Sequence, residues 1–180
     1  YKVSMSMERK GLDGVIIAGY EVGGHPSADG VGTFVIARRC AADMKIPVIA
    51  AGGVYTGEDI KKYMDLGASG VQMGTRFVAT YECDADDRFK QAYIDAKQED
   101  VTIIKSPVGM PGRALVNNFI DSMRDGGKKP FKCIFHCVKT CEQEKTPYCI
   151  AAALINAMKG NLERGFAFCG ENVSRVNNIV

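Results

Sequence analysis

The chain has 180 residues and a net charge of +2, and it is 46% hydrophobic and 24% charged. These values are typical of one folded domain, or one domain with an appendage, and they exclude a disordered, collagenous or coiled-coil protein. The balanced charge does not indicate a basic surface that would bind nucleic acid or an anionic membrane. No apolar run is long enough for a transmembrane helix. We therefore expect neither nucleic acid nor a membrane as a partner.

The first half of the chain alternates between short apolar runs and amphipathic segments. Strands are predicted over residues 14–18, 47–51 and 70–74, and helices over residues 33–44 and from 57 to about 66. A further helix is expected to begin at residues 77–80. Buried strands joined by helical crossovers form a parallel sheet, so the fold class is α/β. Such a sheet carries its binding residues at the carboxyl ends of its strands.

The second half has a different pattern. It predicts an amphipathic helix over residues 86–97, a short strand over 101–104, a loop over 106–112 and a helix over 113–124. A polar linker follows over residues 126–132, then a cysteine-rich segment and an apolar helix over 149–159. This half carries no regular strand–helix alternation.

Glycines follow two of the predicted strands, where they would let backbone N–H groups approach a phosphate. Gly52 and Gly53 end the second strand, and Gly74 with Thr75 follows the third. Phosphate binds where several N–H groups converge without side chains in the way. Because the two strands are expected to be neighbours, the two exits together predict a phosphate clamp.

His25 is one of two histidines in the chain, and it follows Gly23 and Gly24 at the end of the first predicted strand. A side chain at that place faces a cleft, and an imidazole with a pKa near neutrality suits proton abstraction beside an electron-withdrawing group. His25 is therefore the candidate catalytic residue. The alternative is a loop histidine that bonds to the backbone.

Three motifs in order, EVGGHP at 21–26, IPVIAAGG at 46–53 and MGTRF at 73–77, resemble the nitronate monooxygenase (2-nitropropane dioxygenase) family. Flavin-dependent enoyl-[acyl carrier protein] reductase II is a close relative within it. The resemblance implies FMN bound on a (β/α)8 TIM barrel, with His25 as the active-site histidine. It also implies a small-molecule substrate, which is a nitronate or an enoyl thioester. The residues that it implies for cofactor binding are Gly23, Gly24, Ala51, Gly52, Gly53, Gln72, Met73, Gly74 and Thr75.

The chain is too short for a whole barrel of this kind, which takes at least about 200 residues. Its three strand–helix units would correspond to the sixth, seventh and eighth, and three parallel strands alone leave two open edges and a bare core face. We therefore expect the C-terminal part of the FMN-binding barrel over residues 1–125 and a mostly helical, Cys-rich extension over residues 126–180. A short natural protein that completes its sheet with a second copy, as a homo-oligomer, is the alternative.

Seven cysteines are unusual for this length, and an odd number argues against a secreted disulfide framework, so a cytoplasmic location is expected. Cys133, Cys137 and Cys141 are four residues apart, and on a helix they would share one face; Cys149 follows soon after. Four thiolates can hold zinc or an iron–sulfur cluster. The alternative is a set of buried thiols that act as small apolar side chains.

Three functions are consistent with these patterns. The first is an FMN-dependent oxidoreductase that oxidises alkyl nitronates with O2, of which this chain is a fragment. The second is an NAD(P)H- and FMN-dependent enoyl-[acyl carrier protein] reductase. The third, from a different class, is a non-catalytic metal-binding or assembly module in which the cysteine segment carries the function.

Overall fold

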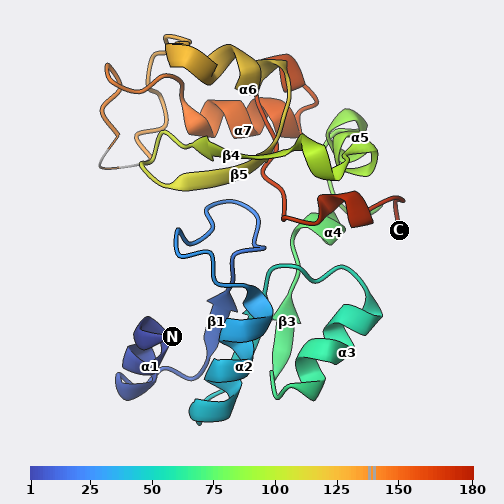
Figure 1. Cartoon of the computed structure of the whole chain (residues 1–180). Helices are drawn as coiled ribbons and strands as arrows, with labels where there is room; N and C mark the ends of the chain where they lie inside the picture. Colours follow the sequence, from blue (N-terminus) through green and yellow to red (C-terminus); the bar gives the residue numbers. More distant parts are fainter. Residues whose placement is uncertain (138, 140) are drawn as a thin grey trace.

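The computed structural model describes residues 1–137, 139 and 141–180. Figure 1 shows the chain as two stacked parts, with the N-terminal sheet and its helices below and a hairpin with further helices above. The lower part contains α1 (Lys2–Arg9), β1 (Val15–Ala18), α2 (Thr33–Asp43), β2 (Val48–Ala51), α3 (Gly57–Asp65) and β3 (Gly70–Gln72). The α/β fold expected from the sequence is confirmed, with every predicted strand of this half within a few residues of its predicted bounds.

The three strands of the lower part form one parallel sheet in the order β1-β2-β3. Val15 of β1 lies opposite Val48 of β2, and Ile49 of β2 lies opposite Gly70 of β3. Since all three strands run the same way, their carboxyl ends meet at one edge of the sheet. The loops that carry the predicted site residues therefore leave from the same edge.

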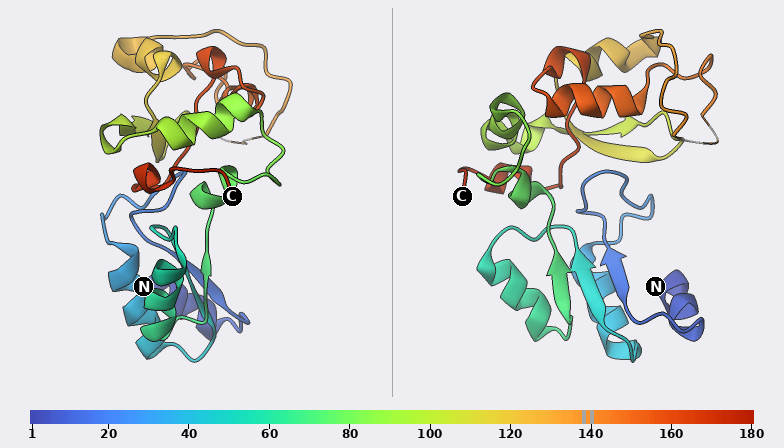
Figure 2. Two further views of the ribbon diagram at one scale, coloured as in Figure 1. Left: turned by 90° about the vertical axis from the view of Figure 1, so that its right-hand side faces the viewer. Right: turned by 180° about the vertical axis from the view of Figure 1, so that it is seen from behind.

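The sheet buries one of its two faces. Ile17 and Val48 pack with Cys40 of α2, while Ala50 packs in a cluster with Tyr63 of α3. Ile16, which points to the opposite face, is 58% exposed. Seen from behind, the strands lie in front of α2 and α3 (Figure 2, right). The period of two along β1 thus divides the sheet into a helix-covered face and an open one.

The upper part is built on an antiparallel hairpin of β4 (Val101–Lys105) and β5 (Pro111–Leu115). The chain reaches it through α4 (Thr75–Val78) and α5 (Asp87–Asp95), and leaves it through α6 (Asn118–Met123) and α7 (Ile150–Met158). Short 3-10 helices lie at Gln98–Asp100, Arg124–Gly126, Leu162–Arg164 and Val173–Arg175. Among the helices of the described residues, none has the length and apolar character needed to cross a membrane.

Two expectations for the second half are wrong, and one helix of the first half begins earlier than expected. Residues 111–115 form strand β5 instead of a loop followed by the start of a helix, because their backbone pairs with β4 from Val101 to Lys105. The helix begins only at Asn118, where the side chain of Asn117 caps it by accepting from Ile120 N at 2.9 Å. The helix expected to begin at residues 77–80 is α4, which begins at Thr75 and ends at Val78.

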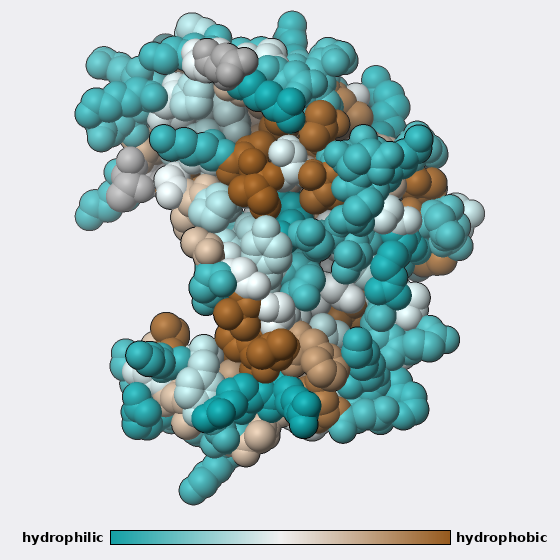
Figure 3. Space-filling view, viewed as in Figure 1, coloured by the Kyte–Doolittle hydropathy of each residue, from teal (hydrophilic) through white to brown (hydrophobic). Residues whose placement is uncertain are grey.

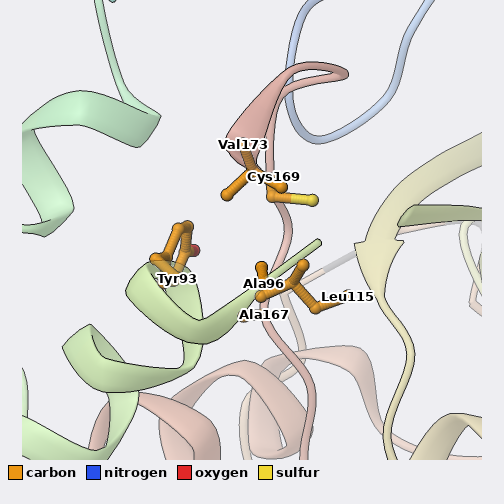
Figure 4. Close-up of a cluster of buried hydrophobic side chains, with 6 residues drawn as sticks. All are labelled: Tyr93, Ala96, Leu115, Ala167, Cys169 and Val173. Atoms are coloured by element: carbon orange, nitrogen blue, oxygen red, sulfur yellow. The ribbon is translucent and has the colours of Figure 1, made fainter. Parts of the chain in front are cut away.

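Two apolar clusters hold the upper part together. Figure 4 shows the first, which joins α5, the end of β5 and the C-terminal segment; its buried members are Tyr93, Ala96, Leu115, Ala167, Cys169 and Val173. The second joins the hairpin to α6 and α7 through Ala114, Phe119, Tyr148, Ala153 and Phe166, among others. The predicted division between residues 125 and 126 stays a prediction, and this second cluster contains residues from both sides of it.

Candidate active site

A cavity of about 360 Å³ lies at the carboxyl edge of the parallel sheet. Its volume is in the range of small-molecule sites. All three strand exits contribute to its wall. Figure 3 shows that the outline of the molecule is indented between its lower and upper parts. All nine residues predicted to bind the cofactor line it: Gly23, Gly24, Ala51, Gly52, Gly53, Gln72, Met73, Gly74 and Thr75.

The exit of β2 needs two consecutive glycines. Gly52 has φ +104° and Gly53 has φ +75°, a region that side chains other than glycine rarely adopt. A Cβ on Gly52 would lie 2.7 Å from the backbone nitrogen of Val22, so the loops after β1 and β2 approach closely there. A capping box follows, in which Thr56 Oγ1 accepts from Asp59 N and the Asp59 carboxylate accepts from Thr56 N. The loop after β2 is therefore fixed by its close contact with the loop after β1 and by the capping box at the start of α3.

The exit of β3 leaves its backbone open to the cavity. A Cβ on Gly74 would meet nothing within 4 Å, and the next residue, Thr75, begins α4. In the part of the chain that the structure describes, the N–H groups of Gly53, Gly74 and Thr75 have no protein acceptor. Unpaired N–H groups at the wall of a cavity are suited to an anion.

The one carboxylate among the described residues of the cavity wall belongs to Glu21. Its Oε2 accepts from Thr33 N at 2.7 Å and from Thr33 Oγ1 at 2.8 Å, which fixes it at the start of α2. Both hydrogen bonds engage the same carboxylate oxygen, so Glu21 connects the loop after β1 to the start of α2.

His25 lies beside this cavity, although it is not among the residues that form its wall. Its neighbour Gly24 is part of the wall, and so is Phe168, whose ring meets the imidazole edge-on at a centroid distance of 5.1 Å. His25 Nε2 is 3.0 Å from Ser106 Oγ. The structure thus brings His25 to the edge of the group of predicted cofactor residues.

Arg113 fixes the loop that carries His25. Its side chain is fully buried, donates to Val22 O at 2.8 Å and to Tyr20 O, and lies 2.5 Å from the carboxylate of Glu171. The guanidinium also covers the ring of Tyr20 at 4.4 Å from its centroid. Arg113 therefore joins the loop after β1, the hairpin and the C-terminal segment.

The cavity wall also contains residues that the sequence did not single out, among them Tyr55, Tyr93, Phe168 and Gly170. Burial raises the pKa of Tyr55 to about 12, so its hydroxyl keeps its proton at neutral pH. Gly170 N donates to Thr75 Oγ1 at 2.8 Å. Phe168 and Gly170 come from the C-terminal segment, whose sequence carries no strand or motif signal. Only tertiary packing places them there.

The cysteine segment does not form the expected helix, since residues 131–137 have no regular secondary structure. A second cavity of about 350 Å³ is lined by Cys133, Cys137, Cys141 and Cys149, together with His136. Within the described residues, which omit 138 and 140, no three His, Cys, Asp or Glu side chains are arranged to hold a metal ion. The zinc or iron–sulfur site is therefore not supported, because without a helix the three thiols do not share one face.

Comparison with known proteins gives a consistent family. Residues 2–180 match the family model described as nitronate monooxygenase. A probable nitronate monooxygenase from Staphylococcus saprophyticus is 34% identical over 131 residues, which are 68% of this chain and 37% of that protein. A probable nitronate monooxygenase from Staphylococcus aureus (strain Newman) is 34% identical over 128 residues, 67% of this chain and 36% of its own length.

Solved structures match almost the whole chain. FabK from Thermotoga maritima superimposes with a TM-score of 0.79 and 31% identity, over 99% of this chain and 53% of that one. Nitroalkane oxidase from Streptomyces ansochromogenes gives a TM-score of 0.71 and 25% identity, over 99% of this chain and 51% of that one. The chain thus spans a little more than a third of its curated relatives and about half of the solved chains.

Proposed function

The chain belongs to the nitronate monooxygenase family, and from this premise we propose that it is the C-terminal part of an FMN-dependent oxidoreductase that oxidises alkyl nitronates with O2. The observation that carries the proposal is the convergence of all nine predicted cofactor residues on one cavity at the carboxyl edge of the sheet. His25 lies at the rim of the same cavity. A group of this kind at strand ends is where α/β barrels place their chemistry.

The cavity fits the phosphate end of FMN. Within the described part of the chain, the N–H groups of Gly53, Gly74 and Thr75 have no protein acceptor, and no described atom lies within 4 Å of the position of a Cβ on Gly74. FMN held there by the backbone of Gly53, Gly74 and Thr75 would supply the redox chemistry between the substrate and O2. The residues of the chain bind the phosphate through backbone N–H groups, enclose the flavin ring and place a proton acceptor beside the substrate.

His25 is the proposed base. For a neutral nitroalkane, the imidazole takes the proton from the carbon next to the nitro group, and the electron pair of that bond stays on the substrate as the nitronate. For a preformed nitronate the proton has already gone, and His25 acts as a polarising group. Arg113 supports either role through the loop, because it bonds Val22 O and keeps the backbone around Gly24 in place.

A second candidate is an NAD(P)H- and FMN-dependent enoyl-[acyl carrier protein] reductase. The same three motifs resemble that enzyme, and the superposition on FabK has a TM-score of 0.79 against 0.71 for nitroalkane oxidase. Both candidates use the same cofactor cavity. NADPH consumption with a crotonyl thioester distinguishes the second candidate function from the first.

We also propose a cytoplasmic location for the protein, which rests on the odd number of cysteines.

The test is turnover of the full-length protein with and without His25. We expect His25→Ala to retain bound flavin and to lower kcat on a neutral nitroalkane by about 10²–10⁴-fold, the usual loss for a positioned base. The matched control is His136→Ala, the other histidine, which lines the second cavity. Oxygen consumption is measured at a pH below that at which the nitroalkane ionises, so that the substrate is neutral. Unchanged kcat in His25→Ala would exclude the base role.

A further inference from the structure

Ser106 contacts His25 from a distant part of the chain. The Oγ of Ser106 lies 3.0 Å from His25 Nε2, although 81 residues separate the two. His25 is in the loop after β1, and Ser106 lies at the tip of the β4–β5 hairpin. Ser106 is 2% exposed, so water does not compete for its hydroxyl as it would at the surface.

The hairpin turn holds Ser106 in place. Ser106 N donates to Met110 O at 3.1 Å, and Gly109 N donates to Ser106 O at 3.0 Å. Gly109 has φ +83°, which lets the chain close this turn with a glycine in the left-handed region. Two hydrogen bonds thus fix the backbone that carries the Ser106 hydroxyl.

The backbone of His25 is fixed from the same hairpin. Arg113 N of β5 donates to Gly24 O at 2.7 Å, directly before the histidine. The ring packs on Phe168 at an angle of 65° between the two planes. These contacts hold the backbone, the ring and the Nε2 atom of His25. The other ring nitrogen, Nδ1, has no hydrogen-bond partner within the described residues.

We propose that Ser106 is a positioning residue for His25, and that it accepts a hydrogen bond from Nε2–H and thereby leaves the Nδ1 lone pair to take the proton of the substrate. The proposal rests on the function proposed above for His25. A neutral imidazole carries one proton, so a proton on Nε2 places the lone pair on Nδ1. Without the serine, the ring can rotate and populate the other tautomer.

The same hydrogen bond supports the step itself. The proton moves from the substrate carbon to Nδ1, and the electron pair remains on the substrate, so nothing is oxidised at this point. The ring then carries N–H on both nitrogens. Nε2–H still donates to Ser106 Oγ, and a hydrogen bond from a charged donor is stronger than one from a neutral donor. Ser106 therefore keeps its hydrogen bond to the ring throughout the proton transfer, and this bond is strongest once the ring has taken the proton.

The first test is kinetic and uses the full-length FMN-loaded protein. A net hydrogen bond of about 0.5–1.5 kcal/mol corresponds to a change of roughly 2- to 13-fold. We expect Ser106→Ala to lower kcat on a neutral nitroalkane within that range, with KM unchanged. The acidic limb of the pH profile, on which the base becomes protonated, should move to lower pH. Ser106→Thr, which keeps the hydroxyl, should recover most of the loss.

A control separates this effect from the general loss of a serine hydroxyl that makes a hydrogen bond. Ser122 Oγ donates to Phe119 O at 2.7 Å in α6, away from the cavity. Ser122→Ala should leave kcat and the pH profile unchanged. Retained flavin absorbance and a normal thermal transition show that each variant is folded.

The second test observes the tautomer directly. The full-length protein is labelled with 15N-histidine, and the His25 signals are assigned by their loss in His25→Gln. We expect the Nε2–H tautomer in the wild type and a mixture of tautomers in Ser106→Ala. This experiment does not need turnover, so it still tests the contact if the proposed activity fails. An Nδ1–H tautomer in the wild type, or turnover and pH profile unchanged in Ser106→Ala, would overturn the proposal and leave the proposed function intact.

Discussion

Arg113 is the residue on which the shape of the site depends most. Its guanidinium is buried against Val22 O and the carboxylate of Glu171, while its own backbone pairs with Gly24. Removing one partner of a buried charged pair is costly because the other partners lose their hydrogen bonds. The loop that carries His25 therefore depends on a side chain from the hairpin.

We predict that Arg113→Leu lowers the free energy of unfolding by about 3–5 kcal/mol. The control is Arg124→Leu, whose ion pair with Asp121 is about half exposed and should contribute less than about 1 kcal/mol. Urea unfolding followed by circular dichroism measures both. Equal losses in the two variants would contradict the role assigned to Arg113.

At this scale the sequence predicts which glycines line one cavity and that His25 lies near them, but it does not predict the contacts between distant residues. Gly52, Gly53 and Gly74 stand in motifs that predict a close approach of the backbone to a ligand, and their role in binding stays a prediction. Arg113 and Gly170 carry no such signal, since their partners lie about 90 residues away in the chain.

The cysteine-rich segment is the element whose predicted structure differs most from the observed one. A spacing of four residues predicts one face of a helix, but a helix also needs hydrogen bonds and an apolar face to pack. Residues 131–137 have neither regular structure nor a buried thiol: Cys137 is exposed and Cys133 is half-buried.

We therefore predict that Cys137 and Cys141 react with an aromatic disulfide reagent in the folded protein at neutral pH. Cys40 and Cys169 should react only after unfolding, because both are buried and burial raises the pKa of both thiols. Peptide mapping after labelling identifies the modified residues. Protection of Cys137 and Cys141 that a chelator removes would instead indicate a bound metal.

The hairpin shows why an element can be missed from local sequence. Residues 113–124 have apolar residues at helical spacing, yet Arg113 to Leu115 are part of β5 and pair with β4. Tertiary pairing overrides a weak local preference. The pair Asn117–Asn118 was the available signal, because asparagine is a favoured helix cap.

The whole molecule exposes one face of its parallel sheet. Ile16 is 58% exposed there, whereas Ile17 on the opposite face is 4% exposed. In a closed barrel this face would be covered by the other strands. Since the chain spans about half of the solved relatives, the remaining strands are the proposed cover in the full-length protein.

Buried phenols give the molecule a predicted pH dependence. Burial raises the pKa of Tyr55, Tyr63 and Tyr148 to about 12, while an unfolded tyrosine ionises near 10. The folded state therefore holds these protons more tightly, and the stabilisation is complete below pH 10 and lost between pH 10 and 12.

We predict that the urea midpoint falls steeply from pH 10 to pH 11.5 and that Tyr148→Phe makes this fall shallower. The two proteins should unfold with the same dependence on pH below 9, which serves as the internal control. Absorbance at 295 nm follows ionisation of the phenols. A midpoint that is constant up to pH 11.5 would contradict the burial of these hydroxyl groups.

The central claim is that the cavity at the strand exits holds FMN, and one residue tests it without disturbing the backbone. Gly74 has φ −114° and open space at the position of a Cβ, so a side chain fits there without strain. The measurement is FMN content per full-length chain, from flavin absorbance after gel filtration, for Gly74→Asp and Gly74→Asn. The account predicts about one FMN per wild-type chain, loss of most of it in Gly74→Asp, and better retention in the uncharged Gly74→Asn. Stoichiometric FMN in Gly74→Asp, or none in the wild type, would contradict it.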